Sequence, residues 1–169
     1  MRIPAAQARE RFLSSPIARL ATADVSGVPH LVPVTFACVG VGVGVGVGVG
    51  VGVGVGVGDG DGDGDGGADL LVFAVDHKPK TTTRLRRLAN IAANPAVCFL
   101  VDEYDDDWTR LWWVRADARA AVLHGAARDA ARAALTEKYR QYRQRVPDGP
   151  VVGARVVRWS GWSAEPPAD

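Results

Sequence analysis

The sequence has few of the residues on which several protein classes depend. Its 169 residues include 2 cysteines, Cys38 and Cys98, and 3 histidines, with no Cys-x-x-Cys pair and no Cys/His cluster. Disulfide-rich secreted scaffolds and zinc sites need such clusters. We therefore expect neither class and predict no metal site. The N-terminus is charged where a signal peptide needs an apolar run, which favours a reduced, cytoplasmic protein.

A membrane-spanning run is also lacking. The one stretch of suitable length, residues 39–58, consists of ten Val-Gly pairs, and four Asp-Gly pairs and Gly67 follow it. Ten glycines in a helix would cost roughly 10 kcal/mol relative to alanine, so a spanning helix is excluded. Strict two-residue repetition indicates low complexity, because folded repeats have units of roughly 20–50 residues. We interpret 39–67 as an insertion, either a loop or a lengthened hairpin arm, in a single domain that spans 1–169.

The Asp-Gly pairs contain the beginning of a calcium-binding loop at Asp59, Asp61, Asp63 and Gly64. Such a loop needs a bidentate Glu at its twelfth position. That position is Leu70, and it is Val72 if the loop begins at Asp61. The pattern therefore does not predict calcium binding.

The insertion hides the charge of the remaining chain. The whole protein has a formal net charge of +1, whereas the 140 residues outside 39–67 carry 20 basic and 15 acidic side chains. This excess of five positive charges suits an anionic ligand and does not require nucleic acid. About half of these residues are apolar, which is enough for one compact core.

Hydrophobic periodicity predicts a mainly β protein, a β-barrel with helices. Two long helices and one short one are expected at 81–94, 126–145 and 4–14. Six strands are expected at 17–23, 28–38, 69–75, 96–103, 109–123 and 151–162. The elements do not alternate as in a parallel α/β protein, so we predict about six antiparallel strands that form a barrel with the helices packed on it.

The residues 75–87, VDHKPKTTTRLRR, connect a buried strand to a helix that is expected to begin near Thr81. Lys78 and Lys80 precede the helix, and hydroxyl and free N–H groups at a helix N-terminus suit a phosphate group. A basic, solvated helix face is the plainer interpretation. A nucleic-acid patch is a weaker one, because the aromatic residues lie elsewhere.

The order of four motifs resembles a known family. The motifs are HLVPVTF (30–36), a strand ending in VDHKPKT (75–81), LRRLANIAANPAVCFLVDEY (85–104) and DDDWTRLWWVRADARA (105–120). In this order they resemble the pyridoxamine 5'-phosphate oxidase-like (PPOX class) split barrels, also called FMN-binding-like split β-barrels. The branch that they resemble uses the deazaflavin coenzyme F420. The resemblance covers the chain outside the insertion.

The resemblance implies a cofactor site. By it, Lys78, Lys80 and Thr81 hold the cofactor phosphate, and Pro33, Val34, Thr35 and Val75 line the ring site. Strand residues near Trp112 to Arg115 approach the cofactor of the other subunit in a homodimer. Alternation places Trp113 and Arg115 on one face of their strand and Trp112 on the other.

No catalytic residue is predicted. His30, His77 and His124 have no Ser, Cys or acidic partner at a telling spacing, and hydride transfer relies on the cofactor rather than on a catalytic dyad. The chain ends in RWSGWSAEPPAD instead of the arginine-rich tail of pyridoxamine-phosphate oxidases, which argues against that substrate.

These expectations describe an oxidoreductase that uses F420 for hydride transfer to or from a small organic substrate. Alternatives are an FMN-dependent oxidoreductase of the same fold and a non-catalytic flavin- or deazaflavin-binding carrier protein.

Overall fold

The protein is mainly β, as predicted. The computed structural model describes residues 1–40, 69–75 and 85–164. Its helices are α1 (Ala5–Ser14), α2 (Arg86–Ala93), α3 (Gly125–Lys138) and α4 (Arg140–Gln144), with a 3-10 turn η1 (Trp108–Arg110). The strands are β1 (Ala18–Ala23), β2 (Pro29–Val34), β3 (Ala37–Val39), β4 (Leu70–Ala74), β5 (Ala96–Glu103), β6 (Trp112–Val122) and β7 (Val151–Ser163).

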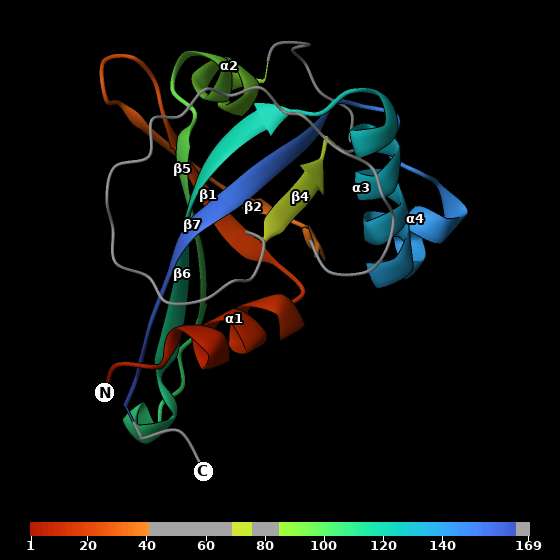
Figure 1. Cartoon of the computed structure of the whole chain (residues 1–169). Coiled ribbons are helices and arrows are strands. Elements are labelled where there is room, and N and C mark those ends of the chain that lie inside the picture. The colour runs from red at the N-terminus through yellow and green to blue at the C-terminus, as the bar shows by residue number, and fades with distance from the viewer. Residues whose placement is uncertain (41–68, 76–84, 165–169) are drawn as a thin grey trace.

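The strands form one antiparallel sheet in the order β2-β1-β5-β6-β7-β4-β3 (Figure 1). β2 and β3 occupy opposite edges of this sheet, yet only Thr35 and Phe36 separate them in the chain. Two residues cannot span a flat sheet of seven strands, since neighbouring strands lie about 4.8 Å apart. The sheet therefore curls until its edges approach each other, which gives a split barrel.

Alternating side chains divide the sheet into an inner and an outer face. Val114, Ala116 and Ala118 of β6 are buried on the inner face, where Phe12 of α1 and Ile91 of α2 also pack. A second apolar cluster lies where α3 packs on β3 and β4, through residues such as Leu135 and Val72. Among the described helices, none packs on the outer face of β1, β5 and β6.

Strand β4 is fixed to α1 where the described chain resumes after the insertion. Arg9 donates two hydrogen bonds to Asp69, of 2.6 and 2.7 Å, and the indole of Trp159 donates a third at 3.3 Å. Arg9 holds the pKa of the Asp69 carboxyl below its usual range. Val39 pairs with Leu70, so the first valine of the repeat is a strand residue.

Three predicted elements are wrong in detail. The strand predicted at 28–38 is two strands, because the chain crosses between the sheet edges at Thr35 and Phe36. The helix predicted to begin near Thr81 begins at Arg86, since Leu85 is extended. The helix predicted at 126–145 is broken at Tyr139, whose hydroxyl binds the backbone of Pro16 and Phe36.

Residues 41–68 lie outside the described chain, so the alternatives for the insertion and the Asp59–Gly64 pattern stay untested. The two positions where calcium binding would require a glutamate, Leu70 and Val72, lie in β4 and pair with β3. No helix in the described ranges is long and apolar enough to cross a membrane.

Candidate functional site

The outer face of the sheet brings together three of the predicted cofactor residues. The register aligns Pro33 of β2 with Arg19 of β1, then Leu100 of β5 and Arg115 of β6. Trp113 lies two residues before Arg115 and so shares its face. Trp112 packs against the inner core instead, and the predicted alternation along this strand is confirmed.

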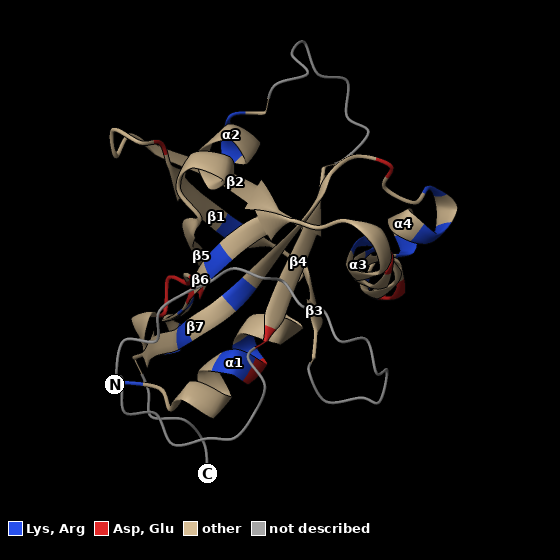
Figure 2. Cartoon of the chain, turned by 45° about the horizontal axis from the view of Figure 1, so that its top comes forward, with Lys and Arg blue, Asp and Glu red and all other residues tan. Residues whose placement is uncertain are grey.

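The same face carries charged side chains that are partly paired. Asp117 accepts hydrogen bonds from Arg158 at 2.7 and 2.9 Å, and Arg115 Nε lies 3.1 Å from the same carboxylate. Two guanidinium groups therefore share one carboxylate, and the trio keeps one net positive charge. Arg19 forms an ion pair with Asp102 further along the face. Figure 2 shows basic residues recurring on the central strands.

Cys98 lies on this face, opposite Asp117 in the β5–β6 register. Burial, with the negative charge of Asp117, raises the pKa of its thiol to about 11. The pKa of the Cys38 thiol, beside Asp69, is also raised to about 11, and burial is the largest cause. A thiol with such a pKa carries little thiolate at neutral pH, and the thiolate is the nucleophilic form.

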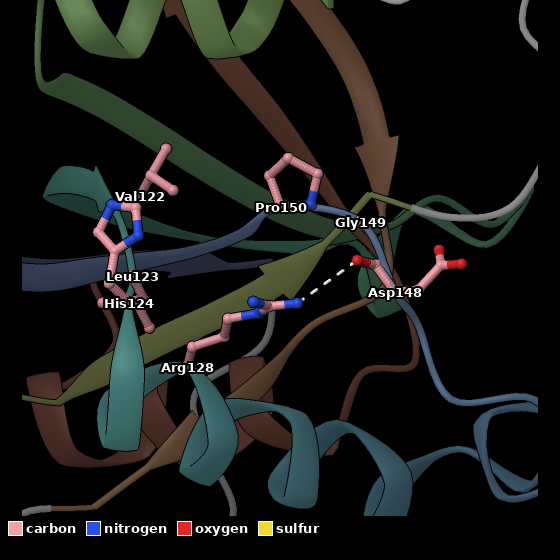
Figure 3. Close-up of a pocket in the computed structure, with 7 residues that line it drawn as sticks. All are labelled: Val122, Leu123, His124, Arg128, Asp148, Gly149 and Pro150. Carbon is pink, nitrogen blue, oxygen red and sulfur yellow. Dashed lines mark hydrogen bonds between the residues drawn. The ribbon is translucent and has the colours of Figure 1, made fainter.

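A second region surrounds Val75, where β4 ends. The Val75 N–H donates to the carbonyl of Pro150 at 2.9 Å, and Gly149 packs directly on the Val75 carbonyl. Gly149 and Pro150 also line a hollow of about 300 Å³ at the beginning of α3 (Figure 3). Its other lining residues are Val122, Leu123, His124, Arg128 and Asp148.

The lining of this hollow combines apolar residues with His124, Arg128 and Asp148. Arg128 donates a long hydrogen bond of 3.5 Å to the Asp148 carbonyl (Figure 3). The side chain of His124, the residue before α3, does not cap the helix. Val75 thus leaves the sheet next to a helix N-terminus and a guanidinium group, and the basic sequence 76–84 follows it in the chain.

Val34 and Thr35 do not share a surface with Pro33. Val34 faces the inner core and is 7% exposed. The Thr35 hydroxyl lies 2.8 Å from the hydroxyl of Tyr142 on α4. The three residues therefore have different surroundings in one copy of the chain, because β2 ends at Val34 and the crossing turns Thr35 toward α4. That Pro33, Val34 and Thr35 line the cofactor ring stays a prediction.

The predicted phosphate residues Lys78, Lys80 and Thr81 lie outside the described residues, and so does His77. Nearby in sequence, Arg86 is exposed and lies 3.9 Å from Asp24. Burial, with the charges of Arg86 and Arg87, lowers the pKa of His30 on the inner face of β2. Two arginines of α2 therefore act on His30 at this end of the barrel.

Within one copy of the chain, the outer face near Trp113 and the hollow near Val75 lie far apart. Trp113 and Val122 lie nine positions apart on β6, and Val122 lines the hollow near Val75. At about 3.3 Å per residue, they are separated by roughly 30 Å. A site that used both Val75 and Trp113 would therefore have to draw them from different copies of the chain.

Several residues of these regions were not predicted from the sequence. Trp162 stands directly opposite Trp113, and Arg158 opposite Asp117, in the β6–β7 register. Alternation along 151–162 could have suggested that Arg158, Ser160 and Trp162 share a face, whereas the register shift beside Val157, which turns Val156 to the inner face, has no such signal. The contact of Tyr142 with Thr35 is long-range and leaves no local signal.

The curled antiparallel sheet with helices at its ends and edge defines the chain as a split barrel. A family model described as Pyridoxamine 5'-phosphate oxidase matches residues 5–163, and the chain belongs to this family. No curated protein sequence matches it.

Solved structures share the fold at low sequence identity. A conserved hypothetical protein from Mycobacterium tuberculosis is 17% identical with a TM-score of 0.63, and the match covers 99% of this chain and 91% of that one. A FAD-binding protein from Mesorhizobium loti is 17% identical with a TM-score of 0.57 over 95% and 93% of the two chains. The haem storage protein HutZ from Vibrio cholerae is 14% identical with a TM-score of 0.57 over 96% and 95%.

Proposed function

We propose that the protein binds a flavin-type cofactor and that this cofactor is the deazaflavin F420. The observation that carries the proposal is the outer sheet face, which bears Trp113 and Arg115 beside a net positive charge and Pro33 three strands away. An aromatic ring system with an anionic tail matches this combination of indole and guanidinium groups. Membership of the family and the FAD-binding neighbour from Mesorhizobium loti support the flavin class.

The activity that we propose is hydride transfer to or from a small organic substrate. The cofactor, when bound, supplies the hydride chemistry, and the protein positions it. The residues of the outer face fit this role, since they offer stacking surface and positive charge. The alternatives are an FMN-dependent oxidoreductase and a carrier without catalytic activity. The carrier alternative is supported by the structural similarity to HutZ, which is described as a haem storage protein.

The cofactor site would lie between two copies of the chain. The outer face of β1, β5 and β6 has no described helix on it, and it carries both arginines and aspartates. A two-fold interface brings the same surface of each copy together, so it requires such a mixed, self-complementary set of charges. In the proposed homodimer, the site would combine Val75 of one copy with Trp113 of its partner.

The cofactor is identified by titrating the purified protein with F420, FMN, FAD and haemin. We expect F420 to bind more tightly than FMN, because its tail adds negative charges that the basic residues 84–87 would contact. The difference should shrink as salt rises, since exposed contacts are screened beyond about 10 Å at 0.1 M ionic strength. Tighter binding of FMN than of F420 at low salt would replace the deazaflavin with FMN. Haemin binding without flavin binding would favour the carrier.

The phosphate residues are tested with Lys80→Ala, which we expect to weaken F420 binding by about 1.5–3 kcal/mol, the range for hydrogen bonds to charged groups. Lys138 is unsuitable as a control, because its amine donates to the carbonyls of Leu13 and Ser15 and lies 3.8 Å from the Phe36 ring. The control is Arg140→Ala, an exposed position on α4. Equal losses from both variants would indicate diffuse electrostatics rather than a specific phosphate contact.

A further inference from the structure

The β6–β7 pair carries two tryptophans that stand directly opposite each other on the outer face. Trp113 and Trp162 are register partners, and Trp162 is 37% exposed. Directly opposed residues of antiparallel strands have Cβ atoms about 5 Å apart, so the two indoles extend from adjacent positions on the same face. The neighbouring residue Gly161 faces the core and packs against Ile3 and Ala8, whereas Trp162 points to the exposed outer face.

Positive charge adjoins this aromatic surface. Arg115 follows Trp113 by two residues and Ser160 precedes Trp162 by two, and these two residues are also register partners. Residues two apart on a strand are separated by about 7 Å. The next partners along the face are Asp117 and Arg158. Arg115 is therefore two residues from Trp113 along β6, and Arg158 is four residues from Trp162 along β7.

We propose that Trp113, Trp162, Arg115 and Arg158 form one recognition site for a planar aromatic ligand with an anionic substituent. The indoles stack on the ring system, and the arginines bind the anionic group through the one positive charge that Asp117 leaves unneutralised. Ser160, between them, offers a hydroxyl at the level of Arg115. The inference rests on the proposed function, which it deepens by assigning Trp162 and Arg158 to the flavin-type cofactor.

Riboflavin and FMN separate the two parts of the site, because they share the ring system and only FMN carries a phosphate. Binding is measured by quenching of the flavin fluorescence in the otherwise intact protein. We expect Trp162→Leu and Trp113→Leu to weaken both ligands about tenfold, in line with the strength of aromatic stacking. Arg158→Gln should weaken FMN several-fold and leave riboflavin unchanged.

Asp117→Asn gives a test of opposite sign. Removing the carboxylate leaves both arginines unneutralised, so FMN binding should tighten while riboflavin binding stays the same. The matched control is Trp108→Leu, which changes an indole that is 78% exposed in the β5–β6 connection and lies off the outer face. Far-ultraviolet circular dichroism and urea unfolding establish that each variant is folded.

Three outcomes overturn the site. If Trp162→Leu and Trp113→Leu bind flavin as tightly as the control Trp108→Leu does, the indoles do not stack on the ring. Unchanged FMN binding in both Arg158→Gln and Asp117→Asn shows that the charged trio does not meet the phosphate. Either result would leave the proposed flavin function standing, whereas a wild-type protein that binds no flavin or deazaflavin would remove both.

Discussion

Asp69 is the residue through which helix α1 and strands β3, β4 and β7 meet. Its side chain is 13% exposed, whereas that of Arg9 is 43% exposed, so water screens part of their attraction. We expect Asp69→Asn to lower the free energy of unfolding at pH 7 by about 1 kcal/mol, the lower end of the range for charged hydrogen bonds and close to that of exposed ion pairs. Urea unfolding measures this loss.

The pH dependence of that loss follows from the pKa of Asp69, which Arg9 lowers in the folded protein. A lowered folded-state pKa means that the stabilisation is present above the unfolded value of about 3.9 and disappears as the pH falls through the folded value. The difference between wild type and Asp69→Asn should therefore shrink in acid. Asp105→Asn, in an exposed ion pair of 3.0 Å with Arg110, is the control and should change little. A difference that grew in acid would contradict the assignment.

Gly149 is a residue that tolerates no side chain. A Cβ there would lie 2.6 Å from the Val75 carbonyl oxygen, which belongs to the backbone and has little freedom to move. We expect Gly149→Ala to destabilise the fold by about 1–3 kcal/mol, as overpacked sites do. A Cβ at Gly40 would meet nothing within 4 Å, so Gly40→Ala is the matched control in the same urea experiment. Equal stability of the two variants would show that the Val75 backbone yields easily.

At the scale of elements, the hairpin of β3 and β4 should fold without the repeat. Val39 pairs with Leu70, and Asp69 is held by Arg9, so both ends of the hairpin are fixed by described contacts. Replacing residues 41–68 with Asn-Gly leaves a tight connection between the strands. We expect an unchanged fold, oligomeric state and F420 affinity, measured by circular dichroism, sedimentation and titration. Loss of the folded protein would show that the repeat is needed for folding.

The elements whose bounds were predicted well are those that begin and end at signals in the neighbouring sequence. Strand β5 was predicted at 96–103 and lies at Ala96–Glu103, since Asn94-Pro95 stops the preceding helix and an acidic turn follows. The 28–38 prediction was wrong because periodicity continues across Thr35 and Phe36 while the chain moves to the other sheet edge. On the outer face, alternation predicted that Trp113 and Arg115 lie on the same side of their strand, whereas Trp162 becomes their neighbour only through pairing with β7.

At the scale of the whole molecule, the proposed dimer can be tested at Leu100. This residue lies between Arg19 and Arg115 in the middle of the outer face. If a second copy covers the face, Leu100→Glu buries a carboxylate at the interface, a change that costs several kcal/mol unless the charge is paired. We expect sedimentation to show a dimer for the wild type and a monomer for Leu100→Glu.

The control for that experiment is Val25→Glu, which places the same charge in the β1–β2 turn at a residue that is 80% exposed. It should remain dimeric. A wild-type monomer at micromolar concentration, or a dimer in both variants, would exclude the outer face as the interface.

The prolines of β2 limit how copies of this molecule can join. Alternate residues of a strand direct their N–H groups to the same side, and β2 keeps its six register pairs with β1 from Ala18–Val34 to Ala23–Pro29. The donors that Pro29 and Pro33 lack are therefore missing from the free edge, which retains the Leu31 N–H between them. At the other edge, β3 is only three residues long. Growth of a continuous sheet from chain to chain, the route to fibrils, is thus opposed at both edges.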